Sequence, residues 1–309
     1  EEDFSEKPEI KKPKGNFNQK DYPINPINYF KKIGVESIFR FISTHPDMDH
    51  LDGIKKLFDD LDVYNFWCIP NNKEFQSDED GRYKKDDWDF YKNLKSGKES
   101  AKTLNIYSGS NGLYYNQEYD NYPNGDCLEI IFPTEDFARE INKSNGNYNN
   151  LSYIILYRDN NKKILFTGDS EDEAWNELLK NKKLLDKIRN IDVLIAPHHG
   201  RTSGGNDTFL NITKPKLTLF GNAKSDHLNY DDWKNKNLLY ITNNQAGSIL
   251  LEINLDKIDV FCTNEKFRDA LISKNIDDID NIDKRYFSYM YKTIKIYVDK
   301  IFEVKKDND

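Results

Sequence analysis

Hydrophobic residues occur along this chain in short runs separated by polar segments, which is the pattern of buried β-strands. Runs rich in Ile, Leu, Val and Phe predict strands. These runs occupy residues 37–43, 63–69, 127–132, 152–157, 163–167, 192–197, 217–220 and 248–253. The runs at 152–157 and 163–167 flank the turn-forming sequence Asp159-Asn160-Asn161, so together they predict a hairpin.

Helices are predicted where apolar residues recur at intervals of three and four. Residues 53–61 carry four apolar side chains at this spacing. Residues 171–180 begin with acidic side chains, which the helix dipole favours. Residues 25–33 start with Asn25, a good N-cap, and Pro26, a favoured first helical residue.

The two ends of the chain and one internal segment depart from this alternation. Residues 1–24 are rich in Lys, Pro and Asn and predict a loop, while residues 71–126 are polar and aromatic and predict a loop-like insert. In the tail, apolar residues at 287–301 fall at helical spacing and predict an amphipathic helix that needs a partner surface. That surface is either the chain's own core or another protein, including a second copy of this chain. The predicted organisation is a domain over 1–262 and a helical extension over 263–309.

Composition narrows the functional classes. The net charge of −8 disfavours a surface that binds nucleic acid by phosphate neutralisation alone, although bound divalent metals would supply positive charge inside a site. No stretch approaches the roughly 20 apolar residues of a membrane span, so we expect no membrane association. The three cysteines form neither a disulfide framework nor a zinc motif, and the polar N-terminus lacks signal-peptide features. A cytoplasmic location is expected.

The five histidines are not scattered, because all of them lie in or near three short stretches. Histidine is the commonest metal ligand, and the clustering with carboxylates predicts a metal site. The candidate ligands are His45, Asp47, Asp49, His50, Asp169, His198, His199 and His227. Three of these groups directly follow predicted strands, whose ends can converge on one edge of a sheet.

Most of these groups also have a structural explanation when taken alone, although paired histidines at a strand exit, as in His198-His199, have no common structural purpose. An Asp-rich stretch after a strand is a common turn, and Asp169 precedes a predicted helix and suits an N-cap. His227 alone is as readily a surface residue as a ligand. The aromatic residues of the insert suit local packing better than stacking on nucleic-acid bases. Taken together, the groups favour a metal site.

Several motifs resemble the metallo-β-lactamase superfamily. His45-Pro46-Asp47-Met48-Asp49-His50 resembles the His-x-Asp-x-Asp-His form of its signature, and Thr167-Gly168-Asp169 resembles its bridging-aspartate strand. Pro197-His198-His199-Gly200 resembles the branch that includes the hydrolase domain of the competence protein ComEC. Further matches to that branch are Asn149–Ser152, Ser203, His227 and Thr242–Ile249, so that the likeness spans about residues 36–262.

The resemblance implies an α+β fold, a four-layer αββα sandwich, with two divalent metal ions, Zn or Mn. His45 and Asp47 would hold the first ion, Asp49 and His50 the second, and Asp169 both. Either His198 or His199, together with His227, would complete the coordination or contact the scissile group.

Three departures from the family pattern stand out. Asp47 replaces a common histidine, which favours Mn²⁺ relative to Zn²⁺. No histidine lies between His50 and His198, so Asn149, Asn150 or water would replace the usual mid-chain ligand. Residues 1–36 lack the family's opening hairpin motif.

The implied function is metal-dependent hydrolysis by a metal-activated water, with Asp49, His199 and His227 as catalytic residues. A phosphodiester in a nucleic acid or nucleotide is the expected substrate, which would make the chain a phosphodiesterase or nuclease. The alternatives are an acyl hydrolase of lactams, lactones or thioesters, and a non-catalytic component of a multi-protein assembly that uses the C-terminal helix.

Overall fold

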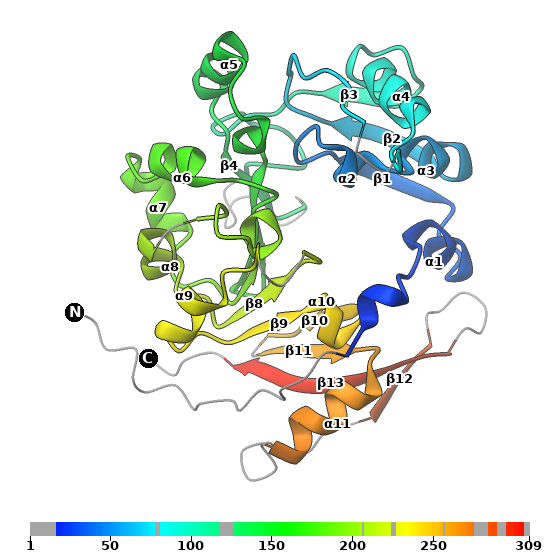
Figure 1. Ribbon diagram of the computed structural model, residues 1–309, viewed down its shortest axis with the longest axis vertical. Coiled ribbons are helices and arrows are strands. Elements are labelled where there is room, and N and C mark those ends of the chain that lie inside the picture. The colour runs from blue at the N-terminus through cyan, green and yellow to red at the C-terminus, as the bar shows by residue number, and fades with distance from the viewer. Residues whose placement is uncertain are drawn as a thin grey trace. The chain divides into compact units, whose positions relative to one another are not determined.

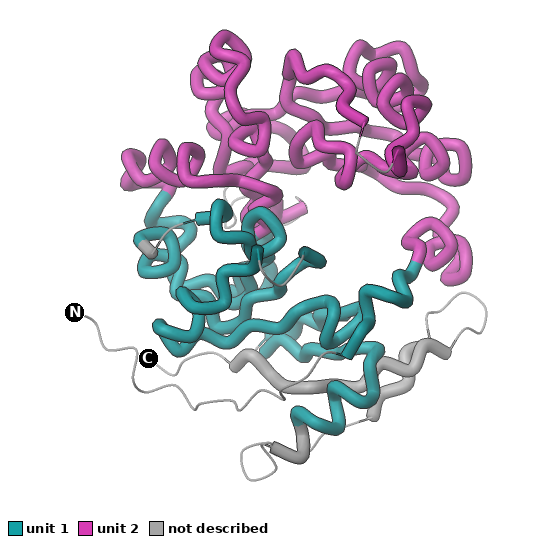
Figure 2. Tube along the Cα trace, in the orientation of Figure 1, with its two compact units in different colours: residues 1–24, 157–165, 185–309 teal, residues 25–156, 166–184 magenta. Residues whose placement is uncertain are grey.

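The computed structural model shows a mixed α and β protein with several separate sheets (Figure 1). It describes residues 17–77, 81–117, 126–205, 207–223, 227–255 and 257–274, and the backbone of 284–288 and 295–305. The chain divides into two compact units (Figure 2). Unit 1 contains residues 1–24, 157–165 and 185–309, and unit 2 contains residues 25–156 and 166–184.

The first half of unit 2 is a parallel three-stranded sheet with helices packed on it. Strand β1 (Ser37–Ile42) pairs with β2 (Asp62–Trp67), and β2 pairs with β3 (Lys102–Leu104). The helices are α1 (Pro26–Lys32), α2 (Met48–Leu51), α3 (Ile54–Asp60) and α4 (Lys85–Lys95). Phe66 and Trp88 are buried in the shared core, and burial of each such aromatic side chain contributes roughly 1.5–3 kcal/mol.

A buried carboxylate joins two of these helices. Asp87 in α4 accepts hydrogen bonds from the backbone amides of Gly53, at 3.1 Å, and Lys55, at 2.9 Å. These amides lie at the start of α3, where the first helical N–H groups lack partners within the helix. Asp87 therefore caps a neighbouring helix, and it anchors the segment that directly follows α2.

The second half of unit 2 contains β4 (Leu128–Phe132), which pairs with β5 (Ile154–Asp159). The helices here are α5 (Glu135–Ser144), the short 3₁₀ helix η2 (Tyr148–Leu151) and α6 (Asp172–Leu178). In α5, Thr134 caps the first turn by accepting from the Phe137 amide. The division between the units falls within β5 and within β6 (Lys162–Phe166).

Unit 1 contains parallel strands connected by short helices. β6 pairs in parallel with β7 (Val193–Ile195), β7 with β8 (Leu217–Phe220), and β8 with β9 (Tyr240–Thr242). The helices between these strands are α7 (Lys182–Lys187), which begins in unit 2, α8 (Asp207–Thr213) and α9 (Tyr230–Asn235), and α10 (Asn243–Ala246) follows β9. A Thr242–Gln245 capping box opens α10, because the two side chains satisfy each other's backbone amides.

An antiparallel sheet and a helix complete unit 1. The sheet has the order β10 (Ile249–Ile253), β11 (Lys257–Cys262), β13 (Lys295–Lys305), β12 (Lys284–Ser288), and α11 spans Glu265–Lys274. The prediction of an amphipathic helix at 287–301 is therefore wrong, because β13 occupies much of that segment. Apolar residues at intervals of three and four did not establish a helix here, because pairing with β11 supplies the strand's backbone hydrogen bonds.

Most other predicted elements are confirmed. The predicted strands correspond to β1, β2, β4, β5, β6, β7, β8 and β10, and the predicted helices to α1, α3 and α6. Asn25 caps α1 by accepting from the amides of Ile27 and Asn28. The insert prediction is wrong in part, since α4 and β3 lie within 71–126. Of the predicted N-terminal loop, residues 1–16 lie outside the described residues, and 17–24 contain only a short 3₁₀ helix.

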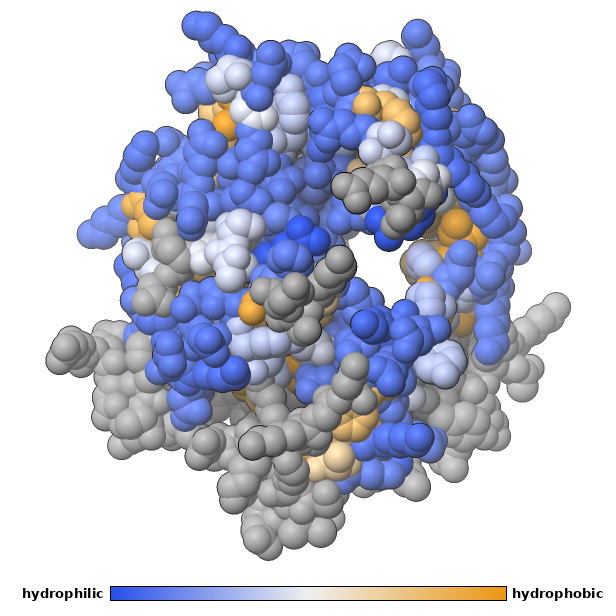
Figure 3. Space-filling view, in the orientation of Figure 1, coloured by the Kyte–Doolittle hydropathy of each residue, from blue (hydrophilic) through white to orange (hydrophobic). Residues whose placement is uncertain are grey.

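The described surface is predominantly hydrophilic on the face shown in Figure 3, with hydrophobic residues in small separate patches. Small patches of this kind are normal for a folded domain. Within the described ranges, no helix has the length and apolar character needed to cross a bilayer.

Candidate metal centre

The first predicted ligand group lies on the loop after β1 and on α2. Met48 and Leu51 are buried and hold α2 against the core. Asp47 is the N-cap residue of α2, but its side chain makes no capping hydrogen bond. An N-cap aspartate usually accepts from the first-turn amides, so the Asp47 carboxylate points to other partners.

Asp169 follows β6 on a tight turn that depends on glycine. Gly168 has φ of +51°, and a Cβ there would lie 2.8 Å from the Ser152 Cβ and 3.0 Å from the Thr44 Cβ. The Asp169 amide donates to the Ser152 hydroxyl at 2.9 Å, and the Tyr153 amide donates to the Thr44 carbonyl at 3.1 Å. These close contacts place Asp169 next to the loop that carries the first ligand group.

Asp169 is not the cap of α6, which was its alternative structural role. The N-cap residue of α6 is Glu171, and the Asn150 Oδ1 atom accepts from the amides of Glu171 and Ala174, both at 3.2 Å. Asn149 and Asn150 also donate to the carboxylates of Glu171 and Glu173. Asn150 therefore caps α6 and Asn149 binds the carboxylate of its N-cap residue, and the prediction that Asn149 or Asn150 replaces a missing metal ligand gains no support.

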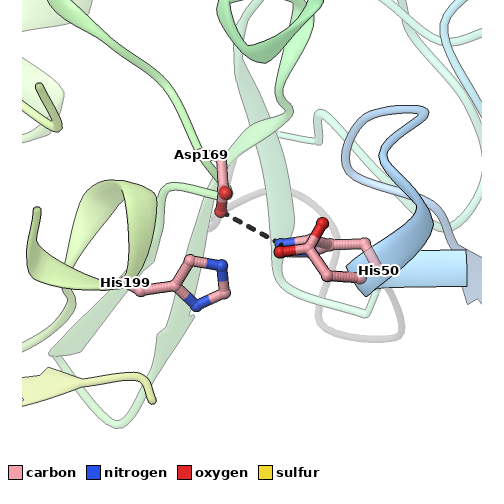
Figure 4. Close-up of side chains that lie close together, drawn as sticks. His50, Asp169 and His199 are labelled. Carbon is pink, nitrogen blue, oxygen red and sulfur yellow. Dashed lines mark ion pairs between the residues drawn. The ribbon is translucent and has the colours of Figure 1, made fainter. Parts of the chain in front are cut away.

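Two histidines face the two oxygens of the Asp169 carboxylate. The His50 Nε2 atom lies 3.2 Å from Oδ1, an ion pair drawn in Figure 4, and the His45 Nε2 atom lies 3.8 Å from Oδ2. His45 Nε2 is also 3.9 Å from the Asp47 Oδ1 atom, and His50 Nε2 is 3.9 Å from the Asp49 Oδ2 atom. Donors that share one ion at about 2.0–2.2 Å each can be at most about 4.4 Å apart, so these spacings suit one ion on each side of Asp169.

His45 provides the strongest test of whether these residues suit a cation. Its side chain is fully buried, and its Nδ1 atom is hydrogen-bonded to the Thr44 hydroxyl at 3.1 Å. Its Nε2 atom makes no hydrogen bond with any described residue. Leaving such a buried atom unsatisfied costs about 1–3 kcal/mol, and a bound cation would satisfy it.

The protonation state of His45 agrees with this role. Burial, with a further contribution from the nearby His50, lowers the pKa of His45 to about 4. The ring is therefore neutral at physiological pH, which is the form that binds a metal. The Thr44 hydroxyl is hydrogen-bonded to the other ring nitrogen, Nδ1. In metal sites, a hydrogen bond to the second nitrogen of a ligating histidine fixes the orientation of its ring.

One partner of this cluster was missed in the sequence. Lys73 forms an ion pair with Asp47, and both side chains are partly buried. Lys73 lies in the predicted insert, and no local pattern connects it with a carboxylate so distant in the sequence.

The remaining predicted ligands belong to unit 1. His198 and His199 lie in the short helix after β7 (Pro197–Gly200) with φ of 46° and 59°, a left-handed conformation that is uncommon outside glycine. The Ser203 hydroxyl is hydrogen-bonded to the His198 Nδ1 atom at 2.7 Å. The exposed His227 is joined to the same segment, since its carbonyl accepts from the Thr202 amide at 3.1 Å.

A close backbone approach supports the His198–His199 turn. A Cβ at Gly200 would lie 2.0 Å from the Phe220 ring, and one at Gly221 would lie 2.8 Å from the His199 Nδ1 atom. Glycine is therefore required at both positions. The three histidines gather within unit 1, while His45, Asp47, Asp49, His50 and Asp169 gather within unit 2, and the metal-binding role of the unit 1 histidines stays a prediction.

No protein-family model matches this chain, and curated proteins include no significant match to its sequence.

Proposed function

We propose that this chain is a divalent-metal-dependent hydrolase of the metallo-β-lactamase type, with the four-layer αββα arrangement that the resemblance implies. The observation that carries the proposal is the carboxylate of Asp169, which presents one oxygen to His50 and the other to the buried, unsatisfied Nε2 atom of His45. A buried carboxylate between two imidazoles is a costly arrangement without a further purpose. Binding of a cation would explain why the carboxylate lies between the two imidazoles.

The residues of unit 2 would have two roles in such a site, metal binding and proton transfer. Asp49, His50 and Asp169 would hold divalent metal, with His45 and Asp47 beside the other oxygen of the Asp169 carboxylate as further candidate ligands, and bound metal would polarise a substrate oxygen and lower the pKa of water. The Asp49 side chain is 42% exposed, so it can reach water and accept a proton during the attack. His199 and His227 contact the scissile group or complete the coordination, as the resemblance implies.

The donor set favours a phosphodiester over an acyl substrate. Three of the five unit 2 donors are carboxylates, and oxygen-rich sites suit the hard divalent ions that accompany phosphoryl chemistry. Base stacking on the insert's core aromatics does not contribute, because Trp88 and Tyr91 are buried in the unit 2 core. We therefore expect recognition of the phosphate and its neighbouring atoms at the metal centre.

The test compares substrates and metals on the full chain. Metal-stripped protein receives Mn²⁺ or Zn²⁺ and is assayed with a generic phosphodiester, a generic carboxylic ester, and single- and double-stranded DNA and RNA. We expect metal-dependent phosphodiester cleavage that Asp169→Asn lowers by about 100-fold or more. The control is Asp136→Asn, an aspartate with a 90% exposed side chain on α5, which should retain full activity.

Two results would contradict the proposal. Ester cleavage without phosphodiester cleavage would make the chain an acyl hydrolase. Unchanged phosphodiester activity in Asp169→Asn would show that this cluster does not carry the chemistry.

A further inference from the structure

The Asp47 carboxylate, which the resemblance assigns to the first metal ion, is paired with a lysine in this structure. The ammonium group of Lys73 forms an ion pair with the Oδ1 atom of Asp47. The same Oδ1 atom lies 3.9 Å from the His45 Nε2 atom. One carboxylate oxygen therefore lies close to both an ammonium group and an imidazole nitrogen.

The loop that carries Lys73 is held in place by hydrogen bonds to the core of unit 2. Asn71, which is buried, donates to the Tyr91 hydroxyl at 2.7 Å and to the Ile69 carbonyl at 3.0 Å. The Lys95 ammonium group donates to the Asn71 carbonyl at 2.8 Å. The Asn71 Oδ1 atom in turn accepts from the Lys73 amide at 3.3 Å, so the backbone that carries Lys73 is held by the core of unit 2.

A second anchor fixes the same loop from α5. The Asn142 side chain accepts from the Asn72 amide at 3.1 Å and donates to the Pro70 carbonyl at 2.7 Å. The Lys73 side chain is only 16% exposed, whereas lysines in the ion pairs within α3 and α4 are 47–66% exposed. A partly buried ion pair on an anchored backbone is screened less by solvent than those surface pairs.

The position of the lysine affects the two halves of the centre differently. On the side of His45 and Asp47, the ammonium group neutralises a carboxylate, and it would repel a divalent cation a few ångströms away. The other side offers ligand atoms of Asp49, His50 and Asp169 that lie within 4.8 Å of one another. We therefore expect this second side to bind a divalent ion more tightly than the first.

We propose that Lys73 serves as a built-in cation for Asp47, so that the chain binds one divalent ion tightly, at Asp49, His50 and Asp169. The side of His45 and Asp47 binds a second ion only when the ammonium group is removed or displaced. The inference rests on the proposed metal centre, and it changes the number of ions from the two that the resemblance implies to one.

The experiment counts bound metal without reference to activity. The full chain is stripped of metal and titrated with Mn²⁺ alone by isothermal titration calorimetry, and the bound ion is examined by electron paramagnetic resonance. The variants are Lys73→Met, which removes the charge and keeps the length, and Lys73→Arg, which keeps the charge. Lys56→Met is the matched control, because Lys56 pairs with Asp60 on α3.

We expect the wild type, Lys73→Arg and Lys56→Met each to bind about one equivalent with the spectrum of isolated Mn²⁺, and Lys73→Met to bind about two equivalents as an exchange-coupled pair. Loss of the ammonium charge should tighten the second site by about tenfold or more. Circular dichroism and a thermal melt establish that each variant is folded.

The alternative outcomes separate this inference from the proposed function. If the wild type binds two ions tightly, or if Lys73→Met still binds one, Lys73 does not replace a metal ion, although the metal centre stands. If the wild type binds no Mn²⁺ at all, and none of the ion in a parallel titration with Zn²⁺, the proposed function fails as well. The number of ions that the wild type binds tightly is by itself a test of the inference, so the inference is testable even if Lys73→Met does not fold.

Discussion

Substitution of Gly168 by alanine tests the geometry that brings Asp169 to its partners. Gly168 has φ of +51°, and its Cβ would lie 2.8 Å from the Ser152 Cβ and 3.0 Å from the Thr44 Cβ. The left-handed backbone costs an alanine about 1–2 kcal/mol. The collision with two packed side chains adds about 1–3 kcal/mol, so we expect Gly168→Ala to lower the free energy of unfolding by about 2–5 kcal/mol in total.

Gly97 offers a matched control in the same unit. It has φ of +69°, and a Cβ there would meet nothing within 4 Å. Gly97→Ala therefore carries the backbone cost alone, about 1–2 kcal/mol. The difference between the two variants isolates the steric contribution at the site.

The assay is urea denaturation monitored by circular dichroism, with the metal-free full chain. Mn²⁺ affinity is measured in parallel, because Gly168→Ala should also displace the Asp169 backbone and weaken metal binding, whereas Gly97→Ala should not. Equal destabilisation by the two substitutions would refute the argument that close packing of Thr44 and Ser152 positions Asp169.

Three further predictions concern the supports of the centre. Asn150→Ala removes the acceptor that caps α6 and should lower the free energy of unfolding by about 1–2 kcal/mol; an Ala variant as stable as the wild type in urea would contradict this role. Asp87→Ala leaves two amides at the start of α3 without their acceptor. It should lower the free energy of unfolding, measured by urea denaturation, by about 1–3 kcal/mol. An unchanged free energy of unfolding would show that water replaces the Asp87 carboxylate. Removal of metal by a chelator should lower the melting temperature of the metal-loaded wild type, since a ligand that binds only the native state stabilises it. The melting temperature of Asp169→Asn should not change. An equal decrease in both proteins would show that the metal binds elsewhere.

Local sequence was sufficient for much of the secondary structure. Asn25 followed by Pro26 starts α1 as predicted, because a cap and its helix are close neighbours in the chain. The strands were visible as apolar runs, since burial of a strand requires several adjacent hydrophobic residues. The grouping of His45, Asp47, Asp49 and His50 was likewise visible, because these four residues lie within one short stretch.

Local sequence misled where another segment supplied the deciding contact. Apolar spacing at 287–301 suggested a helix, but pairing with β11 makes the segment a strand. The insert looked irregular, but α4 within it buries Trp88 and Tyr91 in the unit 2 core. Hydrophobic spacing measures the tendency to be buried, and the partner surface decides which backbone conformation achieves the burial.

For the candidate metal centre, the sequence likewise showed the types of ligand, and the tertiary structure showed their contacts. The residue types that can bind a metal are evident in the chain itself, since imidazoles and carboxylates are chemically suited to cations wherever they lie. Only the tertiary structure showed that Asn150, rather than Asp169, caps α6, and that Lys73 neutralises Asp47. Both facts depend on residues brought together from distant parts of the chain, and electrostatic interactions follow distance in space rather than separation along the sequence.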